Sequence, residues 1–441
     1  MSTPPPPLPL VEDLIREVLL RLPPDDPACL PRASLACKAW HRILTDARFL
    51  RRYREHHRAP PMLGFLRNTD GRGDFSYTHV ARFIPTSSFR PAVDTRRGLY
   101  AIAARHGRVL LHTDPYAGPP SLVVWDPVTD EQCDVPPLPE AAQSRVCFNA
   151  VVLCAAAGCD HLDCHGGPFA VAYVGLPDQD RSTFACLYSS EAGEWGEPAM
   201  LEEAAATSVK SPGVLVGNAV YFTCIHQVTP RIVEYDMGRG ELSVIDLPST
   251  HRCQPGAVLT VTEDGKLGFA GLLRLSLYLW SREAGPDGAV AWTQRRVIQL
   301  DKMLLHFHLG TVAVWHVPSL IGFADGTGVV FVKTETGRVF SVELESGRYQ
   351  KTSFPRFHNG DPGQEPIIIP YMSFYTPGMT KRKLLTHCSV GSLYLVMLYP
   401  YWSIALKEDL SIALRRHDSC ININLLMSVF ASWKPDASTV L

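Results

Sequence analysis

Residues 8–57 read LPLVEDLIREVLLRLPPDDPACLPRASLACKAWHRILTDARFLRRYREHH, and they contain three helical patterns within fifty residues. The first pattern begins near Val11 and ends at Pro23 and Pro24, because proline removes a backbone donor and clashes with the preceding turn. Its apolar residues recur at a period near 3.6 residues, as on one face of an amphipathic helix. This stripe consists of Leu14, Ile15, Val18, Leu19 and Leu22.

The apolar pattern continues beyond the two prolines. Asp25 and Asp26 offer N-cap oxygens ahead of Pro27, so we expect a second helix to begin there, with a kink or restart at Pro31. The apolar residues of the second and third helices are Leu30, Ala33, Leu35, Cys37, Trp40, Ile43 and Leu44.

The last helix carries two kinds of residue, and Thr45 or Asp46 can cap it. Its apolar side has Phe49, Leu50 and Tyr53. Its other side, which we interpret as solvated, has Arg48, Arg51, Arg52 and Arg54.

Part of the apolar stripe is available to a partner, because a domain of roughly 60 residues buries only about 60% of its unfolded surface. The blocks LP, LIREVLLRLP, RASLACKAWHRIL and DARFL occur in an order that resembles an F-box. An F-box is the helical module that docks on the Skp-type adaptor of cullin-RING (SCF-type) ubiquitin ligases. The resemblance implies a small, all-α, three-helix F-box at residues 8–58, preceded by a proline-rich flexible segment at residues 1–7.

The resemblance also implies which residues contact the adaptor or form the core that supports the contact. These are Leu8, Pro9, Leu14, Ile15, Val18, Leu19, Leu22, Leu30, Leu35 and Trp40. Two alternatives remain: a small helical domain packed on its neighbour, and a helix-turn-helix DNA reader with a basic last helix.

The charges disfavour nucleic acid as the main ligand. Residues 1–60 carry 10 Lys/Arg and 7 Asp/Glu, and residues 380–441 carry 7 and 4, so the region between them has a net charge of −8. Phosphate binding relies on Lys and Arg. No charged-then-apolar leader precedes the run Pro4–Pro7, and the 12 cysteines are scattered, so we expect a cytoplasmic or nuclear protein with reduced thiols.

From Pro60 onwards, short apolar runs separated by turn residues replace the helical period, which predicts an all-β region. The candidate strands are residues 64–67, 109–112, 122–125, 170–174, 184–188, 214–216, 220–223, 232–235, 242–245, 277–280 and 329–332.

A strand–turn–strand unit recurs in this region, at spacings typical of propeller blades. Its copies are VVWDPVTDEQ at 123, CLYSSEAGEW at 186, VEYDMGRGEL at 233, LYLWSREAGP at 277 and VFVKTETGRV at 330. At ~45 residues a blade, residues 61–378 would form roughly seven blades. The fold class is therefore α+β and multidomain, with a helical module followed by a β-propeller-like domain of short antiparallel strands.

Several segments resemble the F-box-associated β-propeller that is abundant in plants: RHGRVLL, LVVWDPVTDE, RIVEYDMGRGELSVIDLP, LYLWSREAGPDG and GFADGTGVVFV. This resemblance implies that residues 61–378 bind a protein substrate and that the chain is a non-catalytic substrate receptor within a ubiquitin ligase, without a cofactor. The substrate itself is unknown. A propeller enzyme is the alternative, although the sequence contains no GxSxG elbow.

The segment CAAAGCDHLDCHGG gathers Cys154, Cys159, His161, Cys164 and His165 within twelve residues. The first four of these could close a tetrahedral zinc site. Because the spacing is not that of paired CxxC knuckles, we favour a polar loop between two blade strands and expect no metal. His306 and His308 form a second, weaker pair, which we interpret as surface residues.

Residues 380–441 form a divergent tail, disordered or partly helical. It contains 23 residues, from Leu384 to Leu406, without a charged side chain. This is about the ~20 residues that a membrane-spanning helix needs, so a membrane-anchored protein is a further alternative, although His387 and Pro400 speak against it.

If Leu19 lies in the adaptor interface, Leu19→Asp should abolish adaptor binding, because a desolvated carboxylate without a partner costs several kcal/mol. The measurement is binding of the purified chain to a Skp-type adaptor.

Overall fold

The structure is a computed structural model of the 441-residue chain. It describes residues 10–73, 76–113, 121–138, 148–176, 182–203, 205–207, 212–226, 229–248, 257–273, 275–285, 289–301, 318–334, 336–355, 357 and 367–376. These residues divide into two compact units. The helical unit contains residues 10–60 with 374–376, and the β unit contains the described residues between 61 and 373.

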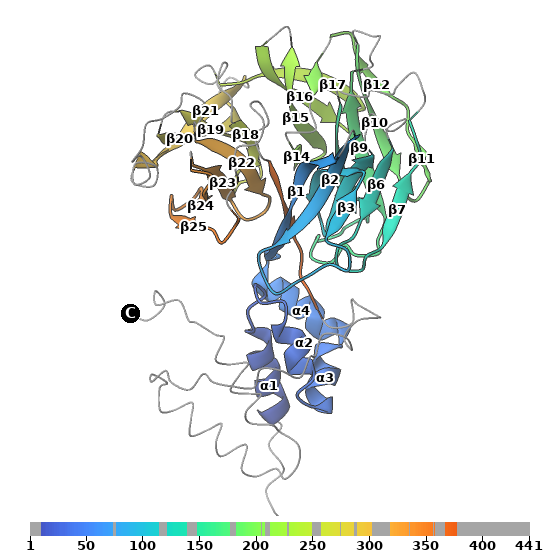
Figure 1. The fold of residues 1–441 in the computed structure, drawn as a ribbon, viewed down its shortest axis with the longest axis vertical. Coiled ribbons are helices and arrows are strands. Elements are labelled where there is room, and N and C mark those ends of the chain that lie inside the picture. Colours follow the sequence, from blue (N-terminus) through green and yellow to red (C-terminus); the bar gives the residue numbers. More distant parts are fainter. Residues whose placement is uncertain are drawn as a thin grey trace, which may run out of the picture. The chain divides into compact units, whose positions relative to one another are not determined.

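The helical unit contains four helices rather than the three expected (Figure 1). They are α1 (Leu10–Leu20), α2 (Cys29–Ser34), α3 (Lys38–Leu44) and α4 (Ala47–His57). A short break after α2 makes the additional helix, because Cys37 is extended, with φ −161° and ψ 165°. Pro31 lies in the first turn of α2, where its missing N–H costs no helical hydrogen bond.

Helix α4 packs through its apolar side, as the sequence predicts. Phe49, Leu50 and Tyr53 are buried, and the Asp46 side chain caps the helix by accepting the N–H of Arg48 at 3.1 Å. The Tyr53 hydroxyl donates to the carbonyl of Leu22 at 2.9 Å, which ties α4 to the end of α1.

The assignment of Arg54 to the solvated side is wrong. This residue is buried, and its Nη2 donates to Oγ1 of Thr376 at 3.3 Å. Thr376 and Phe374, whose ring lies 6.2 Å from that of Tyr53, are also buried. The helical period places Arg54 at the edge of the apolar side, and a segment more than 300 residues later in the chain covers it.

The described strands of the β unit form five sheets. The first has β1 (Met62–Gly73), β2 (Ser76–Pro85), β3 (Thr95–Arg97), β4 (Leu99–Arg105), β5 (Arg108–Thr113), β6 (Leu122–Trp125), β7 (Gln132–Val135) and β26 (Ile368–Met372). The second has β8 (Phe148–Cys154), β9 (Phe169–Gly175), β10 (Thr183–Ser189), β11 (Glu194–Trp195) and β12 (Ala199–Leu201). The third has β13 (Ala206–Thr207), β14 (Val214–Val216), β15 (Ala219–His226), β16 (Thr229–Asp236) and β17 (Glu241–Asp246). The fourth has β18 (Ala257–Val261), β19 (Leu267–Leu273), β20 (Ser276–Ala284) and β21 (Val290–Gln299). The fifth has β22 (Ser319–Ala324), β23 (Val329–Lys333), β24 (Val339–Glu343) and β25 (Tyr349–Lys351).

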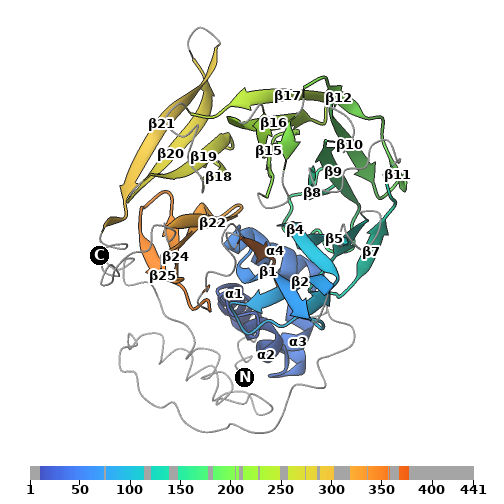
Figure 2. The same ribbon diagram turned by 45° about the horizontal axis from the view of Figure 1, so that its top comes forward.

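The first sheet consists of two blades. A single parallel pair, Val80 with Leu99, joins the group β26-β1-β2-β3 to the group β4-β5-β6-β7. The described strands therefore form six blades around a common centre (Figure 2), one fewer than estimated. Averaged over residues 61–378, six blades take about 53 residues each, connections included, rather than the ~45 assumed for the estimate.

The ring is closed. One strand of each blade contacts a strand of the next: β26 contacts β4, β4 contacts β8, β8 contacts β13, β14 contacts β18, β18 contacts β22, and β22 contacts β26. Buried apolar clusters fill the spaces between neighbouring sheets. The last of these clusters joins Phe331 of β23 to Phe65 of β1 and Ile368 of β26.

All eleven candidate strands lie within observed strands. Four of the five recurring units, those at 123, 186, 233 and 330, are antiparallel hairpins, as predicted. The copy at 277 lies on β20 and ends before β21, the strand that pairs with β20, begins at Val290. The copy at 330 differs from those at 123, 186 and 233, because it spans the second and third strands of its sheet, whereas those three copies end in the outer strand of their meander.

We expect Ile368→Ala to lower the free energy of unfolding of the β unit by about 2–5 kcal/mol, because Ile368 is fully buried where β26 closes the ring. Ile225→Ala is the matched control, since Ile225 is 57% exposed on β15, and it should change stability by less than about 0.5 kcal/mol. Denaturant unfolding measures both variants. Equal effects would contradict the closure of the ring through β26.

A second prediction concerns pH. Burial lowers the pKa of His57, although a hydrogen bond to the carbonyl of Leu20 opposes the shift. Because the unfolded pKa is about 6.5, protonation favours the unfolded chain. The helical unit should therefore be most stable above about pH 6.5 and lose stability as the pH falls through the folded pKa of His57.

Thermal unfolding at several pH values tests this prediction. In His57→Phe, a ring can still pack against Tyr53, whose ring centroid lies 4.5 Å from that of His57, but the side chain cannot take up a proton. This variant should lose less stability on acidification than the native chain. An identical pH dependence in both proteins would contradict the assignment.

Candidate functional site

The structure separates the residues that the sequence could assign only jointly to adaptor contact or its supporting core. Leu19, Leu22, Leu30 and Trp40 are buried in the helical unit, and Ile15 and Val18 are half-buried. Leu14 on α1 is 53% exposed, and Leu35, the C-cap of α2, is 63% exposed. Leu8 and Pro9 lie outside the described residues.

Because Leu19 is buried, Leu19→Asp would test the stability of the helical unit rather than adaptor binding alone. The exposed fraction of Leu19 is 0%, so a carboxylate there would disrupt the core of the helical unit, whether or not a partner binds. Among residues 12–60 and 374–376, Leu14 and Leu35 are the only large apolar side chains that are more than half exposed. They are therefore the best candidates in the helical unit for contact with a partner.

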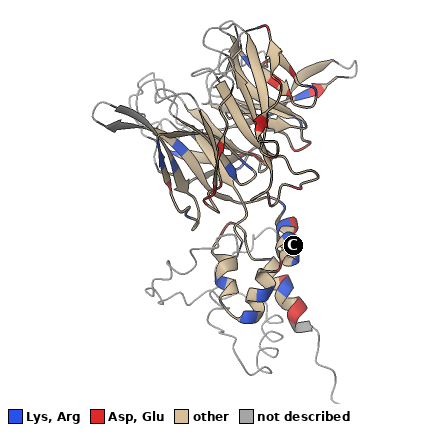
Figure 3. Ribbon diagram, turned by 90° about the vertical axis from the view of Figure 1, so that its right-hand side faces the viewer, with Lys and Arg blue, Asp and Glu red and all other residues tan. Residues whose placement is uncertain are grey.

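The helices carry charges of both signs (Figure 3). Arg52 forms an ion pair with Glu17 of α1 at 2.6 Å, and Arg51 pairs with Glu55 one turn later at 2.9 Å. Arg16 likewise pairs with Glu12. Arg51 and Arg52 of α4 are thus paired with carboxylates, as on a solvated helix surface.

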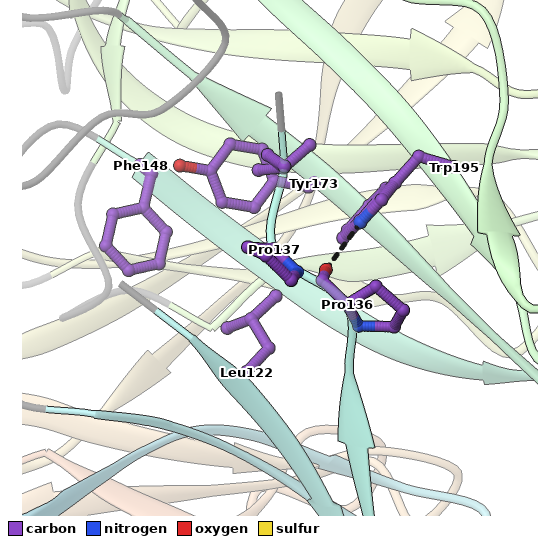
Figure 4. Close-up of a pocket in the computed structure, with 7 residues that line it drawn as sticks. Leu122, Pro136, Pro137, Phe148, Tyr173 and Trp195 are labelled. Atoms are coloured by element: carbon purple, nitrogen blue, oxygen red, sulfur yellow. Dashed lines mark hydrogen bonds between the residues drawn. The ribbon is translucent and has the colours of Figure 1, made fainter. Parts of the chain in front are cut away.

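A small pocket of the β unit lies between the first and second sheets (Figure 4). It is lined by Leu122, Pro136, Pro137, Leu138, Phe148, Tyr173 and Trp195. The indole N–H of Trp195 donates to the carbonyl of Pro136 at 2.7 Å, and this bond holds the end of β7 against β11. The cavity has room for about one water molecule, so we interpret it as a packing feature.

The Cys/His segment is a loop between two blade strands, as the sequence predicts. Cys154 ends β8 and pairs with Phe169, the first residue of β9. The sulfur atoms of Cys154, Cys159 and Cys164 and a ring nitrogen of His161 all lie within 4.8 Å of one another. Sγ of Cys164 is 3.7 Å from Sγ of Cys159 and 3.7 Å from Nδ1 of His161.

His165 does not belong to this group. Its Nδ1 is 2.5 Å from Oδ2 of Asp126, and its Nε2 is 2.9 Å from Oγ of Ser373. Burial would raise the pKa of Asp126, but the hydrogen bonds from His165 and from the backbone of Val128 and Thr129 outweigh burial and lower it. Both ring nitrogens of His165 thus bind partners other than the cysteines.

A second histidine, which no motif in the sequence had indicated, lies beside the cluster. The His106 ring stacks on the His161 ring, with centroids 4.1 Å apart and planes 9° apart. Burial, followed by the charges of Arg105, His161 and Arg108, lowers the pKa of His106 to about 3. Its neutral Nδ1 accepts the backbone N–H of Cys154 at 3.3 Å.

Gly107, which follows His106, must be a glycine. Its φ is +75°, and a Cβ atom would lie 2.8 Å from Cε1 of His165. The turn between β4 and β5 can therefore approach the Cys/His loop closely only without a side chain at this position.

Two other predictions fall outside the described residues: the His306 and His308 pair, and the apolar segment from Leu384 to Leu406. Within the described ranges, no helix is long and apolar enough to cross a membrane.

Comparisons with known proteins give matches to both parts of the chain. A family model described as F-box protein AT5G49610-like, β-propeller, matches residues 101–378, and an F-box domain model matches residues 8–52. A comparison with curated proteins found no match.

Solved structures that are similar to this chain include TolB from Acinetobacter baumannii, with 13% sequence identity and a TM-score of 0.37. That match covers 72% of this chain and 68% of TolB. The β-propeller domain of Cps50 (Swd1) from Myceliophteria thermophila has 11% identity and a TM-score of 0.32, with 66% of this chain and 90% of that one covered.

Proposed function

The chain belongs to the F-box proteins with an AT5G49610-like β-propeller, and from this membership we propose that it is the substrate-recognition subunit of an SCF-type cullin-RING ubiquitin ligase. In this proposal the helical unit docks on a Skp-type adaptor and, through it, on a cullin. The propeller binds a protein substrate. We also infer a plant source from the repeat segments, and a cytoplasmic or nuclear location.

The observation that carries this proposal is the exposure of Leu14 and Leu35 within the region that matches an F-box. The helical unit has a buried core of its own, which includes Leu19, Leu30 and Trp40, so its fold does not need these two side chains for core packing. An adaptor surface that covers them would gain about 25 cal/mol per Å² of apolar area removed from water.

The mechanism that we propose is positional. The chain makes and breaks no covalent bond; it holds the adaptor with one unit and the substrate with the other. Tethering raises the effective concentration of substrate lysines near the ubiquitin-carrying part of the ligase, and orientation lowers the entropic cost of transfer. Members of such complexes other than this chain supply the chemistry, so we infer a non-catalytic role.

We expect Leu35→Asp and Leu14→Asp each to weaken adaptor binding at least about tenfold, because a carboxylate desolvated in an apolar interface costs more than ~1 kcal/mol. Neither change should alter thermal unfolding, since both side chains are more than half exposed. Calorimetry with the full chain and a purified Skp-type adaptor measures the affinity.

Met200→Asp is the matched control, because Met200 is 57% exposed on β12 of the β unit. It should leave adaptor affinity unchanged. If Leu14→Asp and Leu35→Asp bind the adaptor as tightly as Met200→Asp does, the adaptor face is wrong.

The substrate-receptor role has a separate test in cells. The double variant Leu14→Asp/Leu35→Asp should retain substrate binding but no longer support ubiquitination, so proteins bound to the propeller should accumulate on it. Quantitative proteomics of proteins captured by the native chain and by the double variant makes the comparison. Equal capture and equal protein levels in both cases would contradict the receptor role.

A further inference from the structure

We propose that Cys154, Cys159, His161 and Cys164 bind one structural zinc ion in the loop between β8 and β9. The three sulfur atoms and one ring nitrogen converge within 4.8 Å. The site is in the β unit, and the inference does not depend on the ligase function proposed above.

The distances fit a tetrahedral ion. With Zn–S bonds of about 2.3 Å, the sulfur atoms of a tetrahedral site lie about 3.8 Å apart, and a sulfur and a nitrogen ligand about 3.5 Å apart. The observed Cys159 to Cys164 distance is 3.7 Å, and the Cys164 to His161 distance is also 3.7 Å. Small side-chain rotations would bring the longest separation, 4.8 Å, into the same range.

The ligand atoms, three sulfurs and one nitrogen, indicate which metal the site would bind. Thiolates and imidazole suit zinc, whereas magnesium and calcium prefer oxygen ligands. Four protein ligands fill every position of a tetrahedral ion, which is the arrangement of a structural rather than a catalytic zinc site.

A metal would add a cross-link to a long loop that polar bonds at His165 and Gly167 already hold near its end. Fourteen residues, 155–168, connect β8 to β9, whereas hairpin loops of two to five residues are common. Cys164 is the only buried residue of this loop. A hydrophobic core therefore cannot hold the loop, and a metal that joins its middle to the end of β8 would do so.

Neighbouring groups hold the four ligand residues in place through hydrogen bonds and ring stacking, as outer-sphere groups do in metal sites. The backbone N–H of His161 donates to Sγ of Cys159 at 3.4 Å, a bond that favours the thiolate. His106 stacks on His161 and accepts the N–H of Cys154, which restricts the His161 ring and the end of β8. Arg108 anchors the end of the loop, because its Nη2 donates to the carbonyl of Gly167 at 2.5 Å.

The first experiment measures metal in the native full-length chain, purified under reducing conditions without added metal. Elemental analysis should find about one zinc per chain, as four protein ligands require. A mercurial thiol reagent should release the zinc. Replacement of zinc by cobalt should give the near-ultraviolet thiolate charge-transfer bands and the visible d–d bands of tetrahedral Co²⁺, a result that needs no variant.

The second experiment compares variants. Cys159→Ser and His161→Asn should lower zinc affinity by more than ~100-fold, the upper end of the ~10- to 100-fold that changes around the ligands cost. Cys133→Ser, at an exposed cysteine of β7, should retain the native zinc content. His161→Asn preserves the fold, because His161 is exposed and asparagine tolerates its φ of +59°.

The third experiment connects the metal to stability. A chelator should lower the Tm of the native chain and of Cys133→Ser, because zinc binds only the folded site. The Tm of His161→Asn should respond much less.

Three results would overturn the proposal. The first is a folded native chain without zinc that gives no tetrahedral Co²⁺ spectrum. The second is a disulfide between Cys159 and Cys164 in freshly purified protein, found by mass spectrometry. The third is equal loss of zinc in Cys133→Ser and Cys159→Ser, which would indicate binding elsewhere.

Discussion

The β unit depends on the pairing of β26 with β1, which joins strands from the two ends of the ring. Five of the six blades use consecutive stretches of chain, and the sixth is complete only when β26 arrives. Without it, β1 would present an unpaired edge, and β4 and β22 would each lose a neighbouring strand. Because a propeller blade cannot cover its own faces, the loss of one neighbour exposes apolar surface on both sides of the gap.

The same strand anchors regions that the ring alone would not hold. The Tyr371 hydroxyl donates to the carbonyl of Gly107 at 2.9 Å, and Ser373, the residue that follows β26, contacts His165 in the Cys/His loop. Three segments that are distant in sequence thus meet through polar contacts rather than apolar packing. Such contacts require specific partners, and a zinc ion bound to four side chains of the loop would serve the same purpose at a point where almost nothing is buried.

The sequence predicted the parts of the fold that depend on local periodicity. Strand alternation and turn residues identified eleven of the 26 described strands and four hairpins correctly, and Asp46 was one of two predicted caps. The other fifteen described strands were not among the candidates. One of them is β26, whose sequence IIPYM contains Pro370, a residue that usually indicates a break. It is tolerated here because β26 is at the end of its sheet path, where one side of the strand makes no ladder bonds.

Local periodicity could not predict which side chains are buried by segments distant in the sequence. A helical wheel groups Arg54 with other arginines, and nothing local to α4 indicates that Phe374 and Thr376 cover this region. For the same reason, one apolar stripe contained both the fully buried Leu19 and the half-exposed Leu14. Periodicity gives the direction of a side chain from its helix axis, but the neighbouring helices determine which part of that side becomes core.

The exposed leucines of the helical unit and the Cys/His cluster of the β unit differ in how far their geometry alone indicates a function. Single exposed leucines are normal on protein surfaces, so Leu14 and Leu35 gain significance only because they lie within an F-box match. The Cys/His cluster needs no such match. Three thiols and an imidazole at near-tetrahedral spacing, on a loop with one buried residue, form an arrangement that hydrophobic packing does not explain. The proposed zinc ion would account for the convergence of the four side chains and would hold the loop that joins β8 to β9.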